Sequence, residues 1–190
     1  MKTLIRIAVA LAVLFVVLIG SAFLLPRTYR VERSIEIAAP AAEVFRHVGD
    51  LRAWSGWTAW AEMDPEMESE FSENSTGVGA WQQWSGPKVG NGRLELTATE
   101  PPRLVRYDLF FPDYDMRSAG EIVLAPTVDG AGVVVTWTDS GDVGFQPFMR
   151  WFALLFDRMI GGDFETGLAK LKQLTERAVV VPTTGSGEGA

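Results

Sequence analysis

The chain offers few side chains that could carry out chemistry. Cysteine is absent, and His47 is the single histidine among 190 residues. This excludes disulfides, thiolate nucleophiles, iron–sulfur clusters and cysteine zinc sites, as well as a multi-histidine metal site within one chain. A serine nucleophile with a histidine base would have to use His47. Because His47 lies beside the apolar helical stripe of Val44, Phe45 and Val48, we interpret it as a surface or core-edge residue. We predict no catalytic triad, no metal and no cofactor.

Two carboxylates remain as candidates for general acid–base catalysis. Glu95 and Asp108 each interrupt an apolar strand pattern, and their apolar neighbours point to the opposite strand face. This pattern favours side chains that face solvent. If either faced inward, loss of hydration would raise its pKa and suit it to proton transfer. Arg93 and Arg106 could pair with these acids across the sheet. The acidic run 62–73 lacks the calcium-loop pattern and predicts a solvated strand face.

Tryptophan is the more unusual signal. The chain has seven, and five of them lie between Trp54 and Trp84. Core packing explains most of such a cluster, but indole rings can also line an apolar cavity while their N–H groups orient a ligand. A place at a membrane interface is a third interpretation. Trp81 and Trp84 have opposite strand parity, so one faces inward and the other outward.

The sequence therefore predicts an apolar binding cavity rather than a catalytic constellation. The side chains expected to line it are Trp57, Trp81, Trp84, Tyr107, Trp137, Phe152 and Phe156, with Glu95 and Asp108 as candidate polar groups.

An uncharged run precedes these residues. Ile7 to Leu25 contains 19 residues without a charge, which as a helix would span roughly 28 Å, close to the thickness of a bilayer core. A cleaved signal peptide has a shorter apolar core, and here the run continues past the small residues 20–22. We therefore predict an uncleaved membrane anchor over residues 1–28. A cleaved signal peptide and a buried soluble helix are the alternatives.

Charge gives a weak indication of orientation and a clear one on partners. Lys2 and Arg6 before the run are matched by arginines after it, so the positive-inside rule gives little preference for either membrane orientation. Since a short amino-terminal stub usually stays inside, we expect a single-pass inner-membrane protein with its domain on the periplasmic side. Of 17 lysines and arginines, only these two precede position 26, which leaves 15 against 24 acidic residues. That balance excludes a nucleic acid partner.

The rest of the chain alternates between strand and helix patterns. Period-two alternation predicts a strand over 29–37, Pro40 opens a short helix, and the tryptophan-rich stretch 51–60 forms a short helix or turn. Turn signals then separate further strands, expected over 62–70, 80–85, 93–99, 104–111, 121–125 and 133–138.

Helical spacing dominates the carboxyl end. Apolar residues from Phe148 to Met159 recur at three- and four-residue steps, Gly161-Gly162 interrupts, and Asp163 caps a second segment. Residues 179–190 form a small-residue tail expected to be disordered. The predicted fold class is α+β: a curved antiparallel sheet wrapped on a long carboxyl-terminal helix, with a cavity between them. The surplus apolar residues of the first segment should line that cavity, contact the membrane or meet a partner.

The order of these segments resembles a known superfamily. The strand 30–37 leads into 39–45 and the tryptophan motif 50–57, and much later come Val-Thr-Trp-Thr at 135–138 and the helical ending 159–172. Together they resemble the START-like (SRPBCC) superfamily, in its polyketide cyclase/dehydrase-type branch with an amino-terminal membrane helix. The resemblance implies a helix-grip domain over residues 29–178, with a cavity for apolar molecules. It does not name an activity, because transporters, cyclases and hydroxylase components share this fold.

Three functional hypotheses follow. The first is a membrane-anchored domain that binds an apolar or amphipathic small molecule, such as a lipid or an aromatic polyketide. The second is a single-span accessory subunit that docks on a membrane protein complex. The third is a cyclase-type enzyme that uses Glu95, Asp108 or Tyr107, although no constellation demands catalysis.

Overall fold

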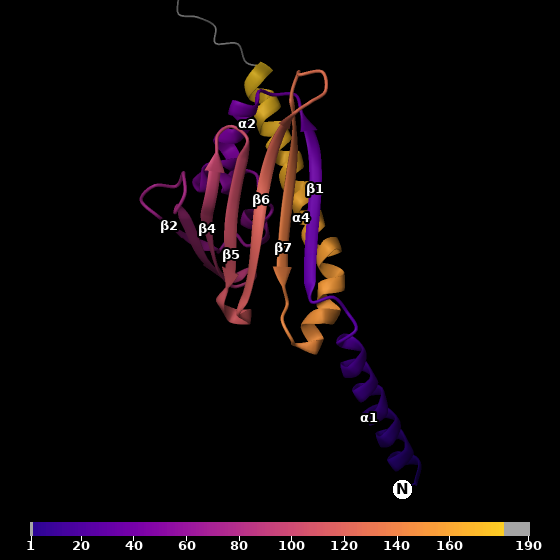
Figure 1. The fold of residues 1–190 in the computed structure, drawn as a ribbon. Helices are drawn as coiled ribbons and strands as arrows, with labels where there is room; N and C mark the ends of the chain where they lie inside the picture. The colour runs from indigo at the N-terminus through magenta and orange to yellow at the C-terminus, as the bar shows by residue number, and fades with distance from the viewer. Residues whose placement is uncertain (1, 181–190) are drawn as a thin grey trace, which may run out of the picture.

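A single antiparallel sheet curves around one long helix, and a separate helix projects from one end of this domain (Figure 1). The computed structural model describes residues 2–180. In that part of the chain seven strands lie in the order β1-β7-β6-β5-β4-β3-β2, each antiparallel to its neighbour. Their bounds are β1 Thr28–Ile37, β2 Glu68–Phe71, β3 Trp81–Gly86, β4 Gly90–Glu100, β5 Leu104–Phe111, β6 Met116–Pro126 and β7 Val133–Asp142.

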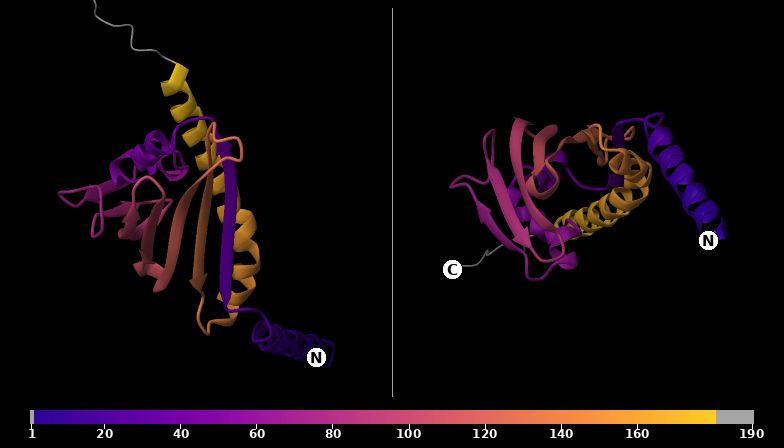
Figure 2. Two further views of the ribbon diagram at one scale, coloured as in Figure 1. Left: turned by 45° about the horizontal axis from the view of Figure 1, so that its top comes forward. Right: turned by 90° about the horizontal axis from the view of Figure 1, so that it is seen from below.

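Helices cover one face of this sheet. The long helix α4 (Pro147–Val180) packs mainly on β1, and α2 (Ala41–Val48) contacts both α4 and β6 at the end far from the projecting helix (Figures 1 and 2). The 3₁₀ turn η1 (Leu51–Gly56) and α3 (Trp60–Met63) follow α2. We call the end that holds the start of β1 and the end of β7, next to the projecting helix, the anchor end.

The two faces of the sheet differ in composition. The inner face, toward α4, carries buried side chains such as Val31, Leu96, Tyr107 and Val135, and the outer face carries the alternate residues, which are more exposed and include most of the charged ones. This period of two is what a sheet covered on one side requires. The predicted helix-grip architecture is therefore confirmed.

The projecting helix α1 (Lys2–Ala22) is long and apolar enough to cross a bilayer, and it is exposed apart from Ser21 and Ala22 at its end. The chain turns from α1 into β1 over the next five residues, close to the expected boundary at residue 28. At the other end, α4 includes residues 179 and 180, where the tail was expected to begin. Residues 181–190 lie outside the described residues.

The prediction of a strand over residues 62–70 is correct only for its second part. Its first part is helical in α3, and only Glu68–Phe71 pairs with the sheet. Asp64 explains the change, because its buried carboxylate accepts hydrogen bonds from the backbone N–H groups of Lys88 (2.8 Å) and Val89 (3.1 Å) in the β3–β4 turn. A side chain committed to a distant turn overrides the local alternation of acidic and apolar residues.

The expected break at Gly161-Gly162 is also wrong, since α4 runs through both glycines. Gly161 lies against the Arg33 guanidinium, which fills the space that a Cβ would need. Arg33 comes from the inner face of β1 and donates to Glu165 (2.6 Å) and Asp157 (2.9 Å) on the helix. Glycine at 161 therefore serves close packing of α4 on β1 and does not end the helix.

The contact between Gly161 and the Arg33 guanidinium predicts that alanine substitutions at Gly161 and Gly162 change the stability in opposite directions. Replacing exposed Gly162 by alanine should raise the free energy of unfolding by about 1 kcal/mol, because nothing lies within contact distance and alanine favours the helix. Gly161→Ala should instead lower it by about 1 kcal/mol, because the methyl group displaces the Arg33 guanidinium from its acidic partners. Denaturant unfolding of the detergent-solubilised chain, followed by tryptophan fluorescence, measures both values. In an Arg33→Ala background, Gly161→Ala should become stabilising; equal stabilisation by both substitutions in the wild-type background would contradict the contact.

Candidate functional site

A carboxylate lies buried on the inner face of the sheet. Asp139 of β7 has the same strand parity as Val135 and Trp137 and exposes only 4% of its surface. Its oxygens accept hydrogen bonds from three hydroxyls: Tyr29 (3.1 Å), Ser118 (3.2 Å) and, at the limit of hydrogen bonding, Tyr107 (3.5 Å). Such a carboxylate is tolerated only because these donors replace water. We call these four residues the Asp139 cluster.

Two glycines allow the phenol rings to reach Asp139. Tyr107 pairs with Gly120, which in turn pairs with Asp139, while Tyr29 pairs with Gly141. Each phenol ring occupies the space above its glycine, where a Cβ would overlap ring atoms. The rings therefore lie flat on the sheet and direct their hydroxyls toward one carboxylate, an arrangement that requires glycine at both positions.

Burial sets the protonation behaviour of the cluster. Desolvation raises the pKa of Asp139 to about 6, against the opposing effect of the three hydroxyl donors. Burial, and then the nearby carboxylate, also raises the pKa of both Tyr29 and Tyr107, so the phenols remain protonated donors. Trp137 donates its indole N–H to the Tyr107 oxygen at 2.8 Å. The cluster is thus a hydrogen-bonded acceptor in apolar surroundings whose charge changes near neutral pH.

Aromatic rings fill the interior beside this cluster. Trp137 stacks on Phe164 of α4 with ring centroids 3.8 Å apart, and Trp54 and Trp57 pack edge-on or tilted around it. Trp57, Tyr107 and Trp137 each expose 1% or less, so no space the size of a water molecule borders them. The expectation that these three line an open cavity is wrong, because their rings pack against one another instead.

The inner face is less deeply buried at the anchor end. Trp84, Phe111 and Met116 form one row across β3, β5 and β6 and are only half-buried. The next row inward carries Leu109 and Ser118, the first member of the Asp139 cluster. The row after that carries Tyr107 and Asp139, about 13 Å from the first row along the strands. Polarity therefore rises with depth, from an accessible apolar edge to a buried carboxylate.

The helix contributes less to this space than the sequence suggested. Phe156 is buried edge-on against Tyr29, with ring centroids 4.8 Å apart. Phe152, one turn earlier, is 36% exposed and packs on Phe148, 4.7 Å between ring centroids. Of these two expected lining residues, only Phe156 faces the interior.

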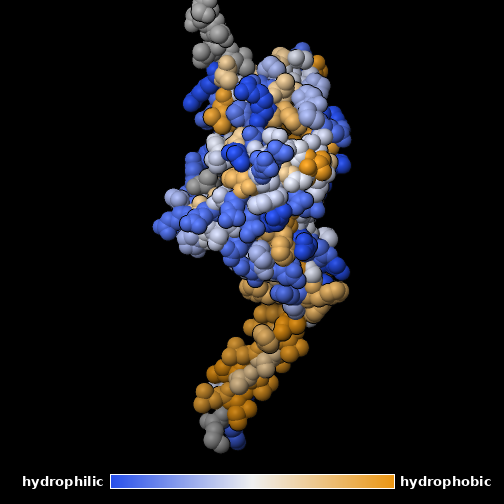
Figure 3. Space-filling model, turned by 90° about the vertical axis from the view of Figure 1, so that its left-hand side faces the viewer, coloured by the Kyte–Doolittle hydropathy of each residue, from blue (hydrophilic) through white to orange (hydrophobic). Residues whose placement is uncertain are grey.

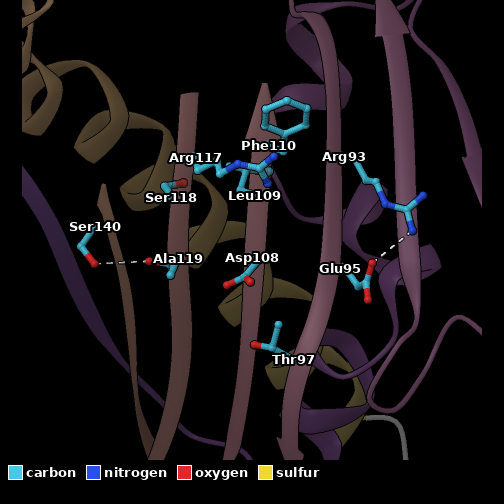
Figure 4. A pocket seen from close by; sticks show the side chains of 10 residues that line it. All are labelled: Arg93, Glu95, Thr97, Asp108, Leu109, Phe110, Arg117, Ser118, Ala119 and Ser140. Atoms are coloured by element: carbon cyan, nitrogen blue, oxygen red, sulfur yellow. Dashed lines mark hydrogen bonds and ion pairs between the residues drawn. The ribbon is translucent and has the colours of Figure 1, made fainter. Parts of the chain in front are cut away.

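The expected polar groups lie on the wrong side of the sheet for an interior cavity. Glu95 and Asp108 are paired on the outer face, as their alternation favoured, and Trp81 lies there too, with its ring 4.5 Å from the Arg93 guanidinium. Arg93 pairs with Glu95 (3.1 Å), whereas Arg106 pairs with Glu121 rather than with Asp108. Of these side chains, Arg93, Glu95 and Asp108 border an open pocket of about 500 Å³ (Figure 4).

His47 takes no part in either site. It is half-buried on α2, 3.9 Å from Glu43, and its backbone carbonyl accepts the Trp57 indole N–H at 3.3 Å. These contacts agree with the prediction of a core-edge residue.

Sequence reasoning missed Tyr29, Ser118 and Asp139 as site residues. The strands were expected to begin at residue 121 and to end at residue 138, because the flanking Ser, Gly and Asp residues are typical of turns. The structure extends β6 back to Met116 and β7 on to Asp142. The sequence did contain one signal for Asp139. It follows Val133, Val135 and Trp137 at the same two-residue spacing, which predicts that its side chain faces inward if the strand continues.

The Asp139 cluster predicts a specific pH dependence of stability. The folded pKa near 6 lies above the ordinary value of 3.8, so the folded state holds the extra proton between these pH values. The free energy of unfolding should therefore fall by up to about 3 kcal/mol as pH rises from 4 to above 6. An Asp139→Asn variant lacks this component, so the wild-type minus variant difference, measured by denaturant unfolding at each pH, isolates it. A difference that stays constant from pH 4 to 7 would contradict the raised pKa.

Solved structures share this fold at low sequence identity. Protein CV1439 from Chromobacterium violaceum is 21% identical with a TM-score of 0.56, and the match covers 80% of this chain and 98% of that one. Protein MLL2253 from Mesorhizobium loti is 24% identical with a TM-score of 0.54 and the same coverage. The di-domain aromatase/cyclase BexL of the BE-7585A biosynthetic pathway is 16% identical with a TM-score of 0.56, over 79% of this chain and 50% of BexL.

No curated protein matches the chain. A family model does match, over residues 28–176, which is nearly the whole domain after α1. Its description, polyketide cyclase/dehydrase and lipid transport, agrees with the curved sheet, the long carboxyl-terminal helix and the similar solved structures. This chain therefore belongs to the polyketide cyclase/dehydrase and lipid transport family of START-like domains.

Proposed function

We propose that this protein is a membrane-tethered domain that binds an apolar or amphipathic small molecule at the half-buried end of its inner face. One observation carries the proposal: a half-buried apolar row leads inward to a buried polar cluster. Trp84, Phe111 and Met116 would contact the apolar part of the ligand. Ser118 and Asp139 would receive its polar group, most favourably a hydrogen-bond donor, because the carboxylate is an acceptor.

Apolar burial would supply most of the affinity. Each square ångström of apolar surface removed from water contributes roughly 25 cal/mol, so covering this edge with a lipid-sized molecule is favourable. The polar cluster would supply orientation, since a hydrogen-bond donor on the ligand could pair with the Asp139 carboxylate, whereas an apolar group could not. Small-molecule sites usually combine apolar walls with a few polar groups.

Tethering by α1 supports the same function. This helix of 21 residues is mostly apolar and, apart from Ser21 and Ala22 at its end, is exposed within the described part of the chain; a bilayer would cover it. A tether of this kind keeps the domain where apolar molecules partition. The proposed location is the inner membrane, with the domain on the periplasmic side.

A cyclase-type enzyme is the second candidate. The raised pKa of Asp139 beside two phenols favours it, because a carboxylate that titrates near neutral pH can exchange protons with a bound ligand. BexL is called an aromatase/cyclase, and its fold is shared. In this hypothesis Asp139 and Tyr107 would act in place of Glu95 and Asp108. If it holds, Asp139→Asn should abolish cyclisation of a linear poly-β-ketone while the protein still retains the bound molecule.

Neighbouring phenylalanines give a matched test of binding. Phe111 faces the inner row and Phe110 the outer face, where it packs on Arg117. Phe111→Asp should lower the amount of lipid or other apolar molecule retained by the detergent-purified full chain at least about tenfold, because it places a charge against the ligand. Phe110→Asp should retain the wild-type amount. Native mass spectrometry and solvent extraction measure both; equal retention in the two variants, or an empty wild type, would contradict the proposed site.

A further inference from the structure

The amino-terminal half of α4 presents an apolar stripe that the domain does not cover. Residues three and four apart repeat along one helix face, and their exposed fractions range from 36% to 68%. The stripe consists of Phe148, Trp151, Phe152, Leu155 and Met159. Phe145, in the loop before α4, is 72% exposed beside it. A soluble domain rarely exposes so large an apolar surface without a use for it.

This stripe lies next to α1, and the two helices are held together by specific contacts. Arg150 exposes only 6% of its surface and donates to the backbone carbonyls of Phe23 and Leu25, each at 3.3 Å, just after the end of α1. It also donates to the carbonyl of Gly144 at 3.3 Å. An arginine that pairs with these free carbonyls fixes the end of one helix on the start of another. The orientation of α1 relative to the domain is therefore set by hydrogen bonds.

Trp151 gives the depth of the contact. Its indole N–H donates to the carbonyl of Leu18 at 3.3 Å. Leu18 lies four residues before Ala22, where α1 ends, which corresponds to about 6 Å along the helix. If α1 spans the bilayer, Trp151 lies near the level where the acyl chains meet the headgroups, the depth that tryptophan favours.

We propose that the α4 stripe, together with Phe145, is a second membrane contact that lies in the headgroup–acyl interface beside α1. This rests on the tether of the proposed function. Continuity with α1 identifies lipid as the occupant, because the apolar surface of the helix continues onto the adjoining end of the domain (Figure 3). A helix that is apolar on one face and bears Asp157 and Arg158 elsewhere is of the kind that lies in this interface.

The contact would also define the source of the ligand. The half-buried row of Trp84, Phe111 and Met116 lies at the anchor end, the end next to α1 and the start of α4 (Figure 1). With the α4 stripe in the interface, this row lies at the end of the domain nearest the bilayer surface. The ligand class is then an amphiphile dissolved in the membrane, which enters with its polar group toward Ser118 and Asp139.

The absence of cysteine makes a direct test possible. Single-cysteine variants of the full chain, Phe148→Cys and Leu155→Cys, would carry a nitroxide label after reconstitution into phosphatidylcholine/phosphatidylglycerol vesicles. Leu14→Cys in α1 is the lipid reference, and Val128→Cys, fully exposed in the β6–β7 turn away from α1, is the aqueous reference. Collision rates with oxygen and with a water-soluble nickel chelate report the surroundings of each label. All four side chains are exposed, so none of the substitutions disturbs the core.

Labels at positions 148 and 155 should collide with the nickel chelate at least about fivefold less often than the label at 128, and should resemble the label at 14. If the label at 14 is shielded but those at 148 and 155 match the label at 128, the tether stands and the second contact is overturned. The stripe would then be left as a docking surface for a membrane protein partner. If the label at 14 is itself open to the chelate, the tether fails and the second contact fails with it.

Discussion

Burial of one carboxylate constrains most of this sheet. Asp139 can remain in an apolar interior only while three hydroxyls from three other strands donate to it, so β1, β5 and β6 must all be in register with β7. The glycines at 120 and 141 follow from the same requirement, because a side chain at either position would lift a phenol ring off the sheet. The polar cluster that we place at the deep end of the ligand site is therefore also a device that fixes strand pairing.

The helix obeys a second constraint, which divides the interior into two parts. The Arg33 guanidinium holds the middle of α4 on the edge strand β1, and Trp137 stacks on Phe164 in the following turns. Indole and phenyl rings consequently fill the half of the interior that lies far from α1. The inner row at the anchor end stays half-buried, and the amino-terminal stripe of α4 is exposed within the described chain. The proposed binding site and the proposed membrane contact therefore lie at the same end of one domain.

Sequence patterns predicted the elements well and the site poorly. Alternation predicted most strands and the outward orientation of Glu95 and Asp108, and the motifs around Trp54 and Trp137 indicated the superfamily. Asp139 was missed because an aspartate followed by serine and glycine is typical of a turn, and only pairing with β1 and β6 shows that the strand continues. The helix was expected to break at Gly161 because the arginine that requires glycine there lies on β1, 128 positions away in the chain.

The sequence by itself determined a lipid-compatible leader, an antiparallel sheet with one apolar face and a long covering helix, because these depend on periodicity between neighbouring residues. Only the tertiary structure decided which aromatic rings fill the core, which carboxylate is buried and where the inner face stays half-buried. Those outcomes depend on contacts between residues far apart in the chain. Tyr29 and Asp139 show the reason: 110 positions separate them, and no local pattern records that one hydroxyl meets the other's carboxylate.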